Sequence, residues 1–311
     1  MICFILGAGF GTRMQPLSEH VPKALVPVAG RPLLERRLEF LSQFPFSQFG
    51  VNAHYFADQM FAFRKTSAHA FELFHEKEKI LGTGGGLRFA ADFLAGEDTF
   101  CVTNAEPLVY VDMASIIAQF ERTDCLGALV ARPVGSNGTI YYDKQSREYA
   151  GPRTELTPEP SLSSADYLCI ALYRREILGL LKNDDFSILP VWKRAQAAGH
   201  SVKIIEAQPS YVKDIGTIAH LAELHFDLLD EKVALDMTDE LKIDTRKKIA
   251  FDRRLAKQER SALKEYAWCE CRSLPGVISI RKSLILPEVN IPKLPAIENT
   301  MLTPWGAFNF A

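Results

Sequence analysis

The 311-residue chain opens with MICFILGAGFGTRMQPLSEHVPKALVPVAGRPLLE, residues 1–35. The apolar run Ile2–Leu6 predicts a buried β-strand, and the glycines directly after it predict a sharp turn. Successive backbone N–H groups in such a turn can point at one position and bind phosphate oxygens. Two cations follow: Arg13, whose forked guanidinium suits a pyrophosphate, and Lys23, which adds a point charge. The stretch therefore predicts a strand followed by an anion-binding loop.

The glycine spacing excludes two common phosphate loops. A G-x-G-x-x-G dinucleotide-binding turn would need glycine where the chain has Thr12, and the G-K-[ST] ending of a Walker loop is absent. No acidic residue ends a second strand about 20 residues further on, which argues against an NAD-dependent oxidoreductase. An ordinary turn would explain Gly7, Gly9 and Gly11. It would not explain the two cations as well.

Short apolar runs alternate with helix-like segments as far as about residue 230. We expect strands at Ile2–Leu6, Phe49–Ala53, Glu72–His75, Thr99–Thr103, Leu126–Ala131, Tyr167–Tyr173 and Val202–Glu206. We expect helices at Pro32–Leu41, with proline at the first position, and at Thr83–Leu94, Met113–Glu121 and Ser187–Ala198. This alternation predicts an α/β fold with a Rossmann-like, mostly parallel sheet and helices on both faces. Such sheets bind ligands beyond the carboxyl ends of their strands.

The composition changes after this α/β region, which we place at residues 1–230. Residues 231–270 are dense in both signs of charge and predict a solvated helical connector. In the tail, residues 271–311, aliphatic side chains recur every six residues, at Ile285, Ile291 and Ile297. Six is the step of a hexapeptide repeat, so we expect a short, degenerate left-handed β-helix, with an extended proline-rich tail as the alternative. Exposed coil ends would make a second copy of the chain a candidate partner.

The overall composition narrows the class of protein. The formal net charge of −2 gives no global attraction to nucleic acid or an anionic membrane, so anion binding must be local. No apolar run reaches the roughly 18 residues of a membrane helix. Six cysteines without framework spacing are typical of a reducing cytoplasm. Cys269 and Cys271 could hold a metal only with further ligands, and thiols at this spacing are more often structural.

Residues 7–33, GAGFGTRMQPLSEHVPKALVPVAGRPL, resemble the signature of the sugar-1-phosphate nucleotidyltransferases, G-x-G-[ST]-R followed about ten residues later by P-K-x-L-x-P-[VI]. The resemblance covers most of residues 1–225 and implies that residues 1–230 are the catalytic domain. It implies that the substrates are a nucleoside triphosphate and a sugar 1-phosphate, and that the products are an NDP-sugar and pyrophosphate. It further implies that Arg13 binds the departing pyrophosphate and Lys23 the α-phosphate. The implied triphosphate-binding residues are Leu6, Gly7, Ala8, Gly9, Gly11 and Thr12.

Three later segments extend the resemblance. LGTGGGL, residues 81–87, is similar to the family's G-T-[AG]-G segment that packs against the nucleobase, which implies roles for Gly82, Thr83, Gly84 and Gly85, with Glu78 as a base or ribose contact. A plain glycine-rich helix start is the alternative. VTNAEPL and YVKDIGT place Glu106 and Asp214 where the family binds Mg²⁺. The alternative for Asp214 is a helix N-cap.

The chain also departs from the family pattern. Glu106 stands where an aspartate is expected, Cys169 replaces a glycine, and the Glu-Lys-Pro sugar-phosphate segment is not visible. Relatives resembling N-acetylmuramate-1-phosphate uridylyltransferases carry T-G-G-G, whereas those resembling mannose-1-phosphate guanylyltransferases more often carry the β-helix tail. The base and the sugar therefore stay open. The departures also leave a second function open, a non-catalytic regulatory homologue that binds sugar nucleotides.

Overall fold

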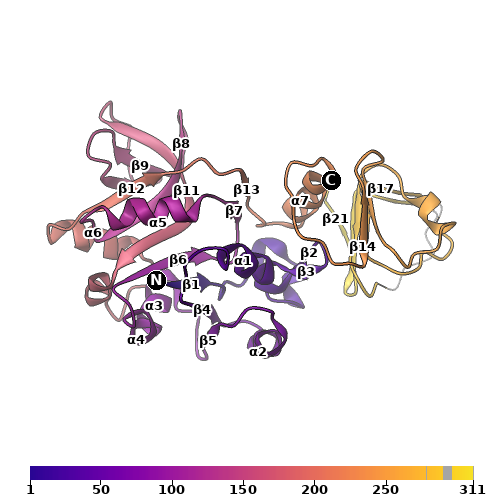
Figure 1. Ribbon diagram of the computed structural model, residues 1–311, viewed down its shortest axis with the longest axis horizontal. Helices are drawn as coiled ribbons and strands as arrows, with labels where there is room; N and C mark the ends of the chain where they lie inside the picture. The colour runs from indigo at the N-terminus through magenta and orange to yellow at the C-terminus, as the bar shows by residue number, and fades with distance from the viewer. Residues whose placement is uncertain (278, 290–295, 311) are drawn as a thin grey trace. The chain divides into compact units, whose positions relative to one another are not determined.

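The computed structural model describes residues 1–277, 279–289 and 296–310 of the chain (Figure 1). The chain divides into two compact units, each built from two segments. The sheet unit contains Met1–Phe10 and Arg37–Val212, and the coil unit contains Gly11–Arg36 and Lys213–Ala311. The division along the chain thus falls inside the glycine loop that follows the first strand.

The sheet unit holds the α/β part of the fold. Its strands are β1 (Ile2–Leu6), β4 (Gln48–Ala53), β5 (Glu72–His75), β6 (Thr99–Asn104), β7 (Leu108–Tyr110), β8 (Gly127–Val134), β9 (Ile140–Asp143), β10 (Tyr149–Pro152), β11 (Leu162–Arg174) and β12 (Val202–Glu206). Its helices are α2 (Ala57–Thr66), α3 (Gly82–Phe89), α4 (Ala91–Leu94), α5 (Met113–Glu121), α6 (Leu189–Ala197) and the 3-10 turn η4 (Arg175–Leu180). Two elements, α1 (Leu33–Leu41) and β13 (Tyr211–Lys213), contain residues of both units.

The central sheet has the order β10-β9-β11-β6-β1-β4-β5, with β8 pairing with β11 and β12. Strands β6, β1, β4 and β5 are mutually parallel, and so are β8 and β12. Strand β11 runs antiparallel to β6, β8 and β9. The parallel core brings the carboxyl ends of β1, β4 and β5 to one edge, where the loops that follow them can share a ligand.

Side chains alternate between the two faces of this sheet, and both faces are covered. Phe4 of β1 belongs to a buried cluster with Leu87 of α3 and Trp192 of α6. On the other face, Arg37 of α1 donates to Thr103 of β6. Figure 1 shows α3 and α4 on one side of β1 and β4 and α5 on the other. The predicted α/β class with helices on both faces is therefore confirmed.

The element boundaries differ from the prediction in a few places. Pro32 lies in the short strand β3 and α1 begins one residue later, so proline is not the first helical residue. The helix expected at Thr83–Leu94 is divided into α3 and α4. The antiparallel direction of β11 was not predicted, because an apolar run carries no information about the direction of its neighbours.

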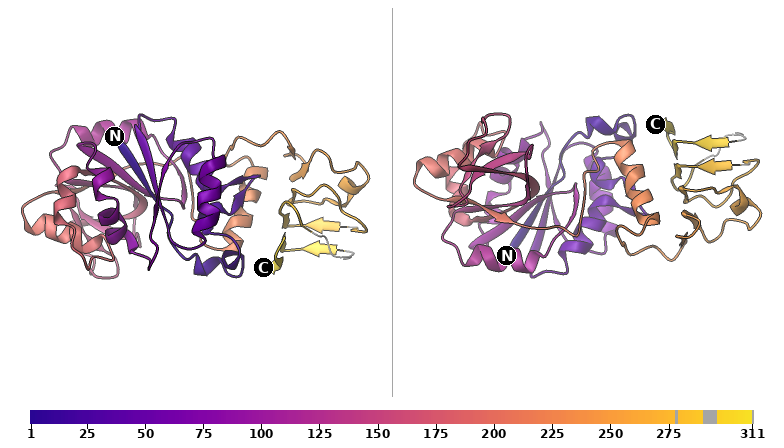
Figure 2. Two further views of the ribbon diagram at one scale, coloured as in Figure 1. Left: turned by 90° about the horizontal axis from the view of Figure 1, so that it is seen from below. Right: turned by 90° about the horizontal axis from the view of Figure 1, so that it is seen from above.

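The coil unit starts with three 3-10 turns, η1 (Thr12–Met14), η2 (Leu17–Glu19) and η3 (Lys23–Leu25), and a hairpin of β2 (Pro27–Val28) and β3 (Arg31–Pro32). Its later segment contains α7 (Ile218–Leu229), β14 (Leu241–Asp244), β15 (Ile249–Asp252), η5 (Glu259–Ala262), β16 (Ala267–Cys269), β17 (Ser279–Arg281), β18 (Ser283–Ile285), β19 (Ala296–Glu298), β20 (Thr300–Thr303) and β21 (Gly306–Asn309). Figure 2 shows its C-terminal strands stacked on one another.

The stacked strands form successive turns of a coil. Strands β15, β16, β18 and β20 are parallel, and their register places Ala250, Trp268, Leu284 and Met301 side by side. These residues are separated by 18, 16 and 17 positions, close to three hexapeptides per turn. Ile285 and Ile297 are buried as expected, whereas Ile291 lies outside the described residues. The strands are thus compatible with the hexapeptide-type tail that was expected.

The helical connector predicted for residues 231–270 is wrong, because β14, β15 and β16 fall within this range. The misleading signal was charge density. Most charged residues of this range are exposed or half-exposed, apart from the buried Asp252 and Glu270, while Leu241, Ile249 and Ala267 are buried. Charge content alone does not distinguish a solvated helix from strands with one wet face. The coil therefore begins well before residue 271.

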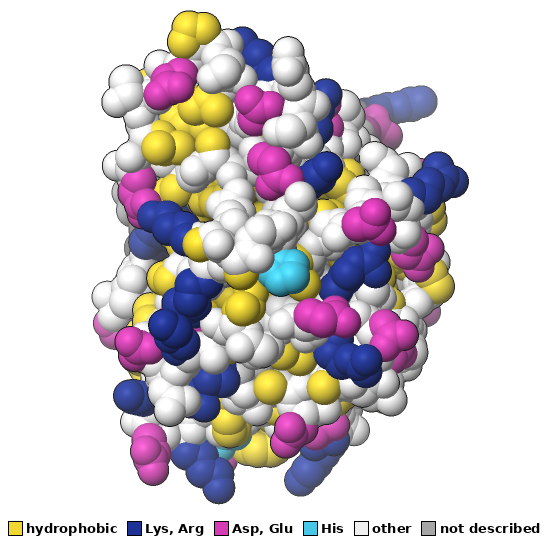
Figure 3. Space-filling model, turned by 90° about the vertical axis from the view of Figure 1, so that its left-hand side faces the viewer, with side chains coloured by type: hydrophobic (Ala, Val, Ile, Leu, Met, Phe, Trp, Pro, Cys, Tyr) yellow, Lys and Arg dark blue, Asp and Glu magenta, His cyan; other side chains and the backbone are white. Residues whose placement is uncertain are grey.

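One face of the molecule can be compared with the near-neutral total charge. On the face shown in Figure 3, Lys and Arg side chains are interspersed with Asp and Glu, without a large area of one sign. Among the described residues, no helix is both long and apolar enough to cross a membrane. Any strong attraction for an anion must therefore be built locally, from a few groups.

Candidate active site

The glycine segment after β1 lies in the sheet unit as far as Phe10. The backbone N–H of Gly7 donates to Oδ1 of Asn52 at 2.7 Å, and Ala8 is buried. Gly9 is exposed, and a Cβ added there would meet no atom within 4 Å. The open space beside Gly9 leaves its backbone accessible to a ligand.

Asn52 and Glu76 connect this segment to the start of α3. Asn52 Nδ2 donates to Glu76 Oε1 at 2.7 Å, and the other carboxylate oxygen accepts the backbone N–H of Leu81 at 2.7 Å. Both side chains are only 2% exposed. A buried carboxylate with two donors forms strong, charge-assisted hydrogen bonds. The network thus fixes the loop containing Gly7 relative to Leu81, the residue before the second glycine segment.

The sequence analysis did not single out Asn52 or Glu76. Asn52 is the penultimate residue of its predicted strand, and Glu76 directly follows another. Polar residues at the carboxyl ends of parallel strands are a recognised place for functional groups, so this signal could have identified both. The residue chosen instead, Glu78, is exposed. Its contact with a base or ribose stays a prediction.

The second glycine segment, Gly82–Gly85, packs against a neighbouring stretch of backbone. A Cβ at Gly82 would lie 2.2 Å from the carbonyl oxygen of Phe186, and one at Gly84 would lie 2.8 Å from that of Ser187. The Gly84 N–H donates to the Phe186 carbonyl at 3.1 Å. These glycines are therefore required by close packing within the protein, whatever else they contact.

Three further predicted residues lie in the sheet unit: Thr83 and Gly85 in the second glycine segment, and Glu106 after β6. Thr83 Oγ1 accepts the backbone N–H of Ile188 at 2.9 Å, and Gly85 is buried in the same helix. Glu106 follows β6, half-buried, and a cis peptide bond joins it to Pro107. Its position directly after a central parallel strand is the position at which ligand-binding carboxylates are expected in this fold class.

In the coil unit, Gly11 allows Lys23 to pack closely. Gly11 has a φ of 63°, in the left-handed region that favours glycine, and precedes η1, which contains Thr12 and Arg13. A Cβ on Gly11 would lie 3.2 Å from the Cβ of Lys23 and 3.3 Å from that of Ser18. Ser18 Oγ donates to the Gly11 carbonyl at 2.9 Å, and Lys23 is only 7% exposed. Lys23 is thus held in one place by its surroundings.

Arg13 and Asp214 are brought together although 201 residues separate them. Arg13 Nη1 donates to Asp214 Oδ2 at 3.5 Å, and their side chains are 64% and 47% exposed. A Cβ on Gly216 would lie 2.8 Å from both Nη atoms of Arg13, so the guanidinium lies directly against the backbone at Gly216. An exposed ion pair of this length is weak and can separate when an anion or a cation arrives.

The interpretation of Asp214 as a helix cap is wrong. The residue that caps α7 is Thr217, whose Oγ1 accepts the backbone N–H of His220 at 3.1 Å. Asp214 precedes the cap by three residues and is half-exposed beside Arg13. Its carboxylate is therefore not committed to the backbone of the helix.

The hairpin that follows Lys23 is held by a buried histidine. His225 of α7 accepts the Ala29 N–H on Nε2 at 3.0 Å and donates from Nδ1 to the Leu221 carbonyl at 2.8 Å. The ring is fully buried and stacks edge-to-face on Trp268 at 4.7 Å. Burial lowers the pKa of His225 to about 4, so the ring is neutral at pH 7.

A buried glutamate holds the same hairpin from the coil. Glu270 Oε1 accepts the Trp268 indole N–H at 2.7 Å, and the carboxylate also accepts a hydrogen bond from the backbone of Gly30. Burial raises the pKa of Glu270 to about 7. Arg36 Nε donates to the Val28 carbonyl at 3.2 Å. The chain after Lys23 is thus fixed by polar groups of α7 and β16.

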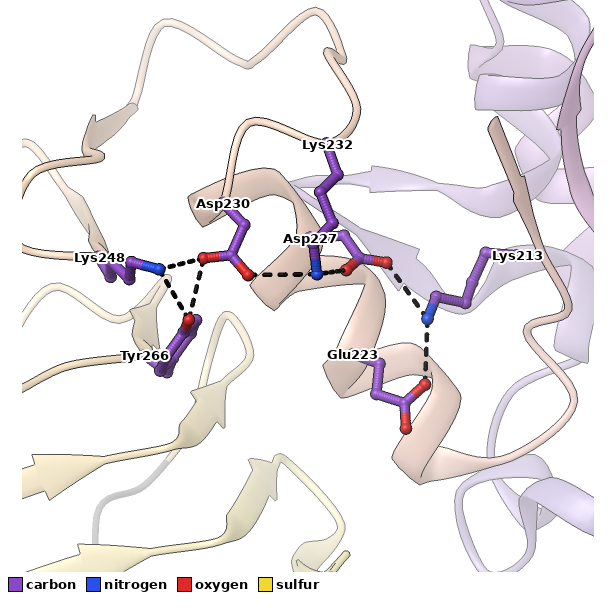
Figure 4. Close-up of polar contacts among 7 residues, drawn as sticks. All are labelled: Lys213, Glu223, Asp227, Asp230, Lys232, Lys248 and Tyr266. Carbon is purple, nitrogen blue, oxygen red and sulfur yellow. Dashed lines mark hydrogen bonds and ion pairs between the residues drawn. The ribbon is translucent and has the colours of Figure 1, made fainter. Parts of the chain in front are cut away.

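A chain of ion pairs runs along α7 (Figure 4). It consists of Lys213 with Glu223 and Asp227, Lys232 with Asp227 and Asp230, and Lys248 and Tyr266 with Asp230. Lys213, at one end, is the residue before Asp214, and Lys248 at the other end belongs to the turn before β15. The network thus anchors the backbone next to Asp214 to α7 and the coil.

The residues available for a metal ion are carboxylates. Among the described residues, no three or more His, Cys, Asp or Glu side chains form a preformed metal cage. Mg²⁺ in phosphate-transfer sites commonly takes one or two protein carboxylates and completes its shell with phosphates and water. Glu106 and Asp214 offer hard oxygen donors suited to that mode of binding.

Comparison with known proteins agrees with this description. The profile of the MobA-like NTP transferase domain matches residues 3–175. The chain is 32% identical over 213 residues to the N-acetylmuramate alpha-1-phosphate uridylyltransferase of Caulobacter vibrioides, covering 64% of this chain and 85% of that protein. It is 28% identical to the mannose-1-phosphate guanylyltransferase catalytic subunit beta of Xenopus tropicalis over 47% of this chain and 42% of that one.

The fold is also shared with solved structures. The UDP-glucose pyrophosphorylase of Acinetobacter baumannii superposes with a TM-score of 0.59 at 18% identity, over 74% of this chain and 94% of that one. At that identity the likeness shows the fold alone. The profile match and the Caulobacter relative show the family: the chain belongs to the MobA-like NTP transferase domain family, among the sugar-1-phosphate nucleotidyltransferases.

Proposed function

We propose that this protein transfers a nucleotidyl group from a nucleoside triphosphate to a sugar 1-phosphate and releases pyrophosphate. The favoured donor is UTP, because the Caulobacter relative, which is matched over 85% of its length, is a uridylyltransferase. The favoured acceptor is N-acetylmuramate 1-phosphate or a sugar phosphate close to it, on the same ground. Guanylyl transfer to mannose 1-phosphate is the second candidate, supported by the lower-coverage similarity to the Xenopus protein.

One observation carries the proposal: two separate family motifs converge within the coil unit. Arg13, from the N-terminal signature, lies 3.5 Å from Asp214 of the YVKDIGT motif, 201 residues later. Gly216 of the same motif leaves the space that the Arg13 guanidinium occupies. The convergence supports a shared role of both motifs in handling the triphosphate.

The proposed chemistry asks the protein for positioning and charge neutralisation. An oxygen of the sugar phosphate attacks the α-phosphorus in line, and pyrophosphate leaves from the opposite side without a covalent enzyme intermediate. Gly7–Thr12 would hold the phosphates with backbone N–H groups, and Arg13 would bind the leaving pyrophosphate. Lys23, buried and held by Gly11 and Ser18, would neutralise charge at the α-phosphate.

The proposed cofactor is Mg²⁺, held by Glu106 and Asp214 together with the phosphates. When bound, it would supply Lewis-acid stabilisation of the phosphate charge. In that state Asp214 would exchange Arg13 for the cation, and the exposed, 3.5 Å ion pair presents little resistance to the exchange. Leu6 and Ala8 would contribute backbone around the phosphates, and Gly82–Gly85 with Glu78 would lie near the base.

A non-catalytic sugar-nucleotide sensor is the alternative function, and three departures from the family pattern favour it: Glu106 in place of aspartate, Cys169 in place of glycine and the missing Glu-Lys-Pro segment. Of these, Cys169 lies at a bulge in β11 with a φ of 56°, a backbone conformation that favours glycine. The retained pair Arg13 and Lys23 favours the enzyme, because a pure binder has less need of groups at the reacting phosphate.

The test is a matrix of UTP, GTP, CTP, dTTP and ATP against sugar 1-phosphates, read by pyrophosphate release with and without Mg²⁺. We expect release with UTP and an N-acetylmuramate-type acceptor, abolished by chelation. Release with GTP and mannose 1-phosphate instead would select the second candidate. No release with any pair, combined with measurable nucleotide binding by calorimetry, would overturn the enzyme in favour of the sensor.

A further inference from the structure

The coil unit contains a pair of thiols that the proposed chemistry does not use. Cys269 ends β16 and Cys271 follows two residues later, so both side chains project to the same side of the extended chain. Their Sγ atoms are 3.2 Å apart. Each belongs to the buried cluster inside the coil, where Cys269 is fully buried and Cys271 retains 5% exposure.

The second observation is a cavity beside Cys271. It has a volume of about 660 Å³ and lies within the coil unit. Among its described lining residues are Cys271, the carboxylates Glu240 and Asp252, and the guanidinium groups of Arg254 and Arg272. A polar, charged wall of both signs suits a small zwitterionic molecule better than an apolar one. The cavity brings such a molecule to the thiol pair from the solvent side.

The two sulfurs differ in their pKa and in their access to the cavity. The neighbouring Cys269 thiol hydrogen-bonds to Cys271 and lowers the pKa of Cys271, whereas the same contact and burial raise the pKa of Cys269. Cys271 is also the member that lines the cavity. The geometry therefore makes Cys271 the attacking thiol and Cys269 the resolving one.

We propose that Cys269 and Cys271 form a thiol-modification site that reacts with small disulfides entering this cavity and closes to an intrachain disulfide. The Cys271 thiolate attacks one sulfur of a disulfide RSSR. This attack forms a mixed disulfide and expels RS⁻, and the RS⁻ takes up the proton that Cys271 lost. The Cys269 sulfur then attacks Cys271 Sγ, breaks the mixed disulfide and releases a second RSH that carries the Cys269 proton. The protein dithiol is oxidised by two electrons and RSSR is reduced to two RSH.

The movement needed is small. A disulfide bond is about 2.0 Å long, so the two sulfurs must approach by about 1.2 Å from their present separation of 3.2 Å. A second thiol pair provides the contrast. Cys3 and Cys101 face each other in the register of β1 and β6, both fully buried in the central sheet. Neither of them lines the cavity beside Cys271. The Cys3 and Cys101 thiols are also in hydrogen-bonding contact, but both are fully buried, whereas Cys271 lines a cavity.

The chain offers a direct assay, because trypsin cleaves after Lys264 and Arg272 and releases both thiols in one peptide, EYAWCECR. The folded, reduced protein is treated with glutathione disulfide, quenched with acid, denatured, alkylated and digested. We expect this peptide to become lighter by two hydrogens and to lose both alkyl groups, and dithiothreitol to reverse the change. The reaction should be at least about tenfold faster than any adduct at Cys3 or Cys101, because those thiols are inaccessible.

Two variants test the division of roles. In Cys269→Ser the mixed disulfide cannot be resolved, so one glutathionyl group should accumulate on Cys271. In Cys271→Ser no adduct should form on Cys269; alanine variants serve where serine disturbs folding, as judged by circular dichroism. The proposal is overturned if the wild-type peptide keeps two alkyl groups at every glutathione ratio, or reacts no faster than Cys3. No nucleotide is used, so this outcome is independent of the proposed transferase activity.

Discussion

The two units hold their parts of the glycine loop in different ways. In the sheet unit, Gly7 is tied through Asn52 and Glu76 to Leu81 by three hydrogen bonds of 2.7 Å, and both bridging side chains are buried. In the coil unit, Arg13 meets Asp214 in an exposed ion pair of 3.5 Å. A buried, satisfied network is costly to break, whereas an exposed pair exchanges partners easily. The part of the loop in the sheet unit is thus a rigid cradle, and the part in the coil unit carries adaptable charged groups.

The largest effect on activity is expected at Lys23, which lies in the coil unit like Arg13 and Asp214 but, unlike them, is buried. Replacing Lys23 by alanine should lower kcat by at least about 100-fold, because a positioned charge at the reacting phosphate is worth about 3 kcal/mol. Steady-state pyrophosphate release measures this, with the exposed Lys77→Ala as the matched control. Turnover like that of the wild type would remove Lys23 from the mechanism.

The hairpin after Lys23 should show an unusual pH dependence. The folded-state pKa of Glu270, about 7, lies above its ordinary value of 4.5. The stability that its protonated form contributes is therefore complete below pH 4.5 and is lost as the pH rises through 7. His225, with a pKa lowered from 6.5 to about 4, acts in the opposite sense and loses its contribution as the pH falls through 4.

The variant Glu270→Gln isolates the first of these contributions. The unfolding free energy of the wild type minus that of the variant should fall by on the order of 3 kcal/mol between about pH 4.5 and 7. Urea unfolding at a series of pH values checks this, with the exposed Glu265→Gln as control. A difference that stays constant across the window would show that Glu270 titrates normally.

Breaking the rigid cradle should cost stability before it costs chemistry. Glu76→Ala leaves the buried donor Asn52 Nδ2 and the part-buried Leu81 N–H without their acceptor. We expect a loss of about 2 kcal/mol in the free energy of unfolding. Glu78→Ala, two residues away and exposed, should change it by less than about 0.5 kcal/mol. Equal stability of the two variants would contradict the bridging role of Glu76.

The smallest changes in stability are expected at two glycines of the same loop, Gly11 in the coil unit and Gly9 in the sheet unit. Gly11→Ala should cost about 1 kcal/mol of stability, because its φ is 63° and the new Cβ would lie 3.2 Å from Lys23. Gly9→Ala meets open space and should leave the stability within about 0.5 kcal/mol. It should nevertheless weaken triphosphate binding about tenfold by calorimetry, since the methyl would occupy the space of the ligand. Unchanged triphosphate binding would show that Gly9 does not contact the nucleotide.

Much of the sheet unit could be predicted from the sequence. Glu72–His75 and Val202–Glu206 were placed at their observed bounds, because short apolar runs between polar segments are a local property. The antiparallel direction of β11 could not be predicted, since direction depends on neighbours. The helix predicted for residues 231–270 was wrong for a different reason, the local composition. There exposed charges dominate the composition, and the buried runs, such as Ile249–Asp252 and Ala267–Cys269, are only three or four residues long.

By itself, the sequence determined the family and the groups that carry charge. Glycine spacing, Arg13, Lys23 and Asp214 are local chemical facts, readable without coordinates. Only the tertiary structure decided which side chains hold the glycine loop and the hairpin after Lys23 in place. Asn52, Glu76, His225 and Glu270 act through contacts between segments distant in the chain. The structure also gave the helix cap to Thr217 and left Asp214 beside Arg13. Such assignments depend on burial and on distances between elements, and a linear pattern of residue types contains neither.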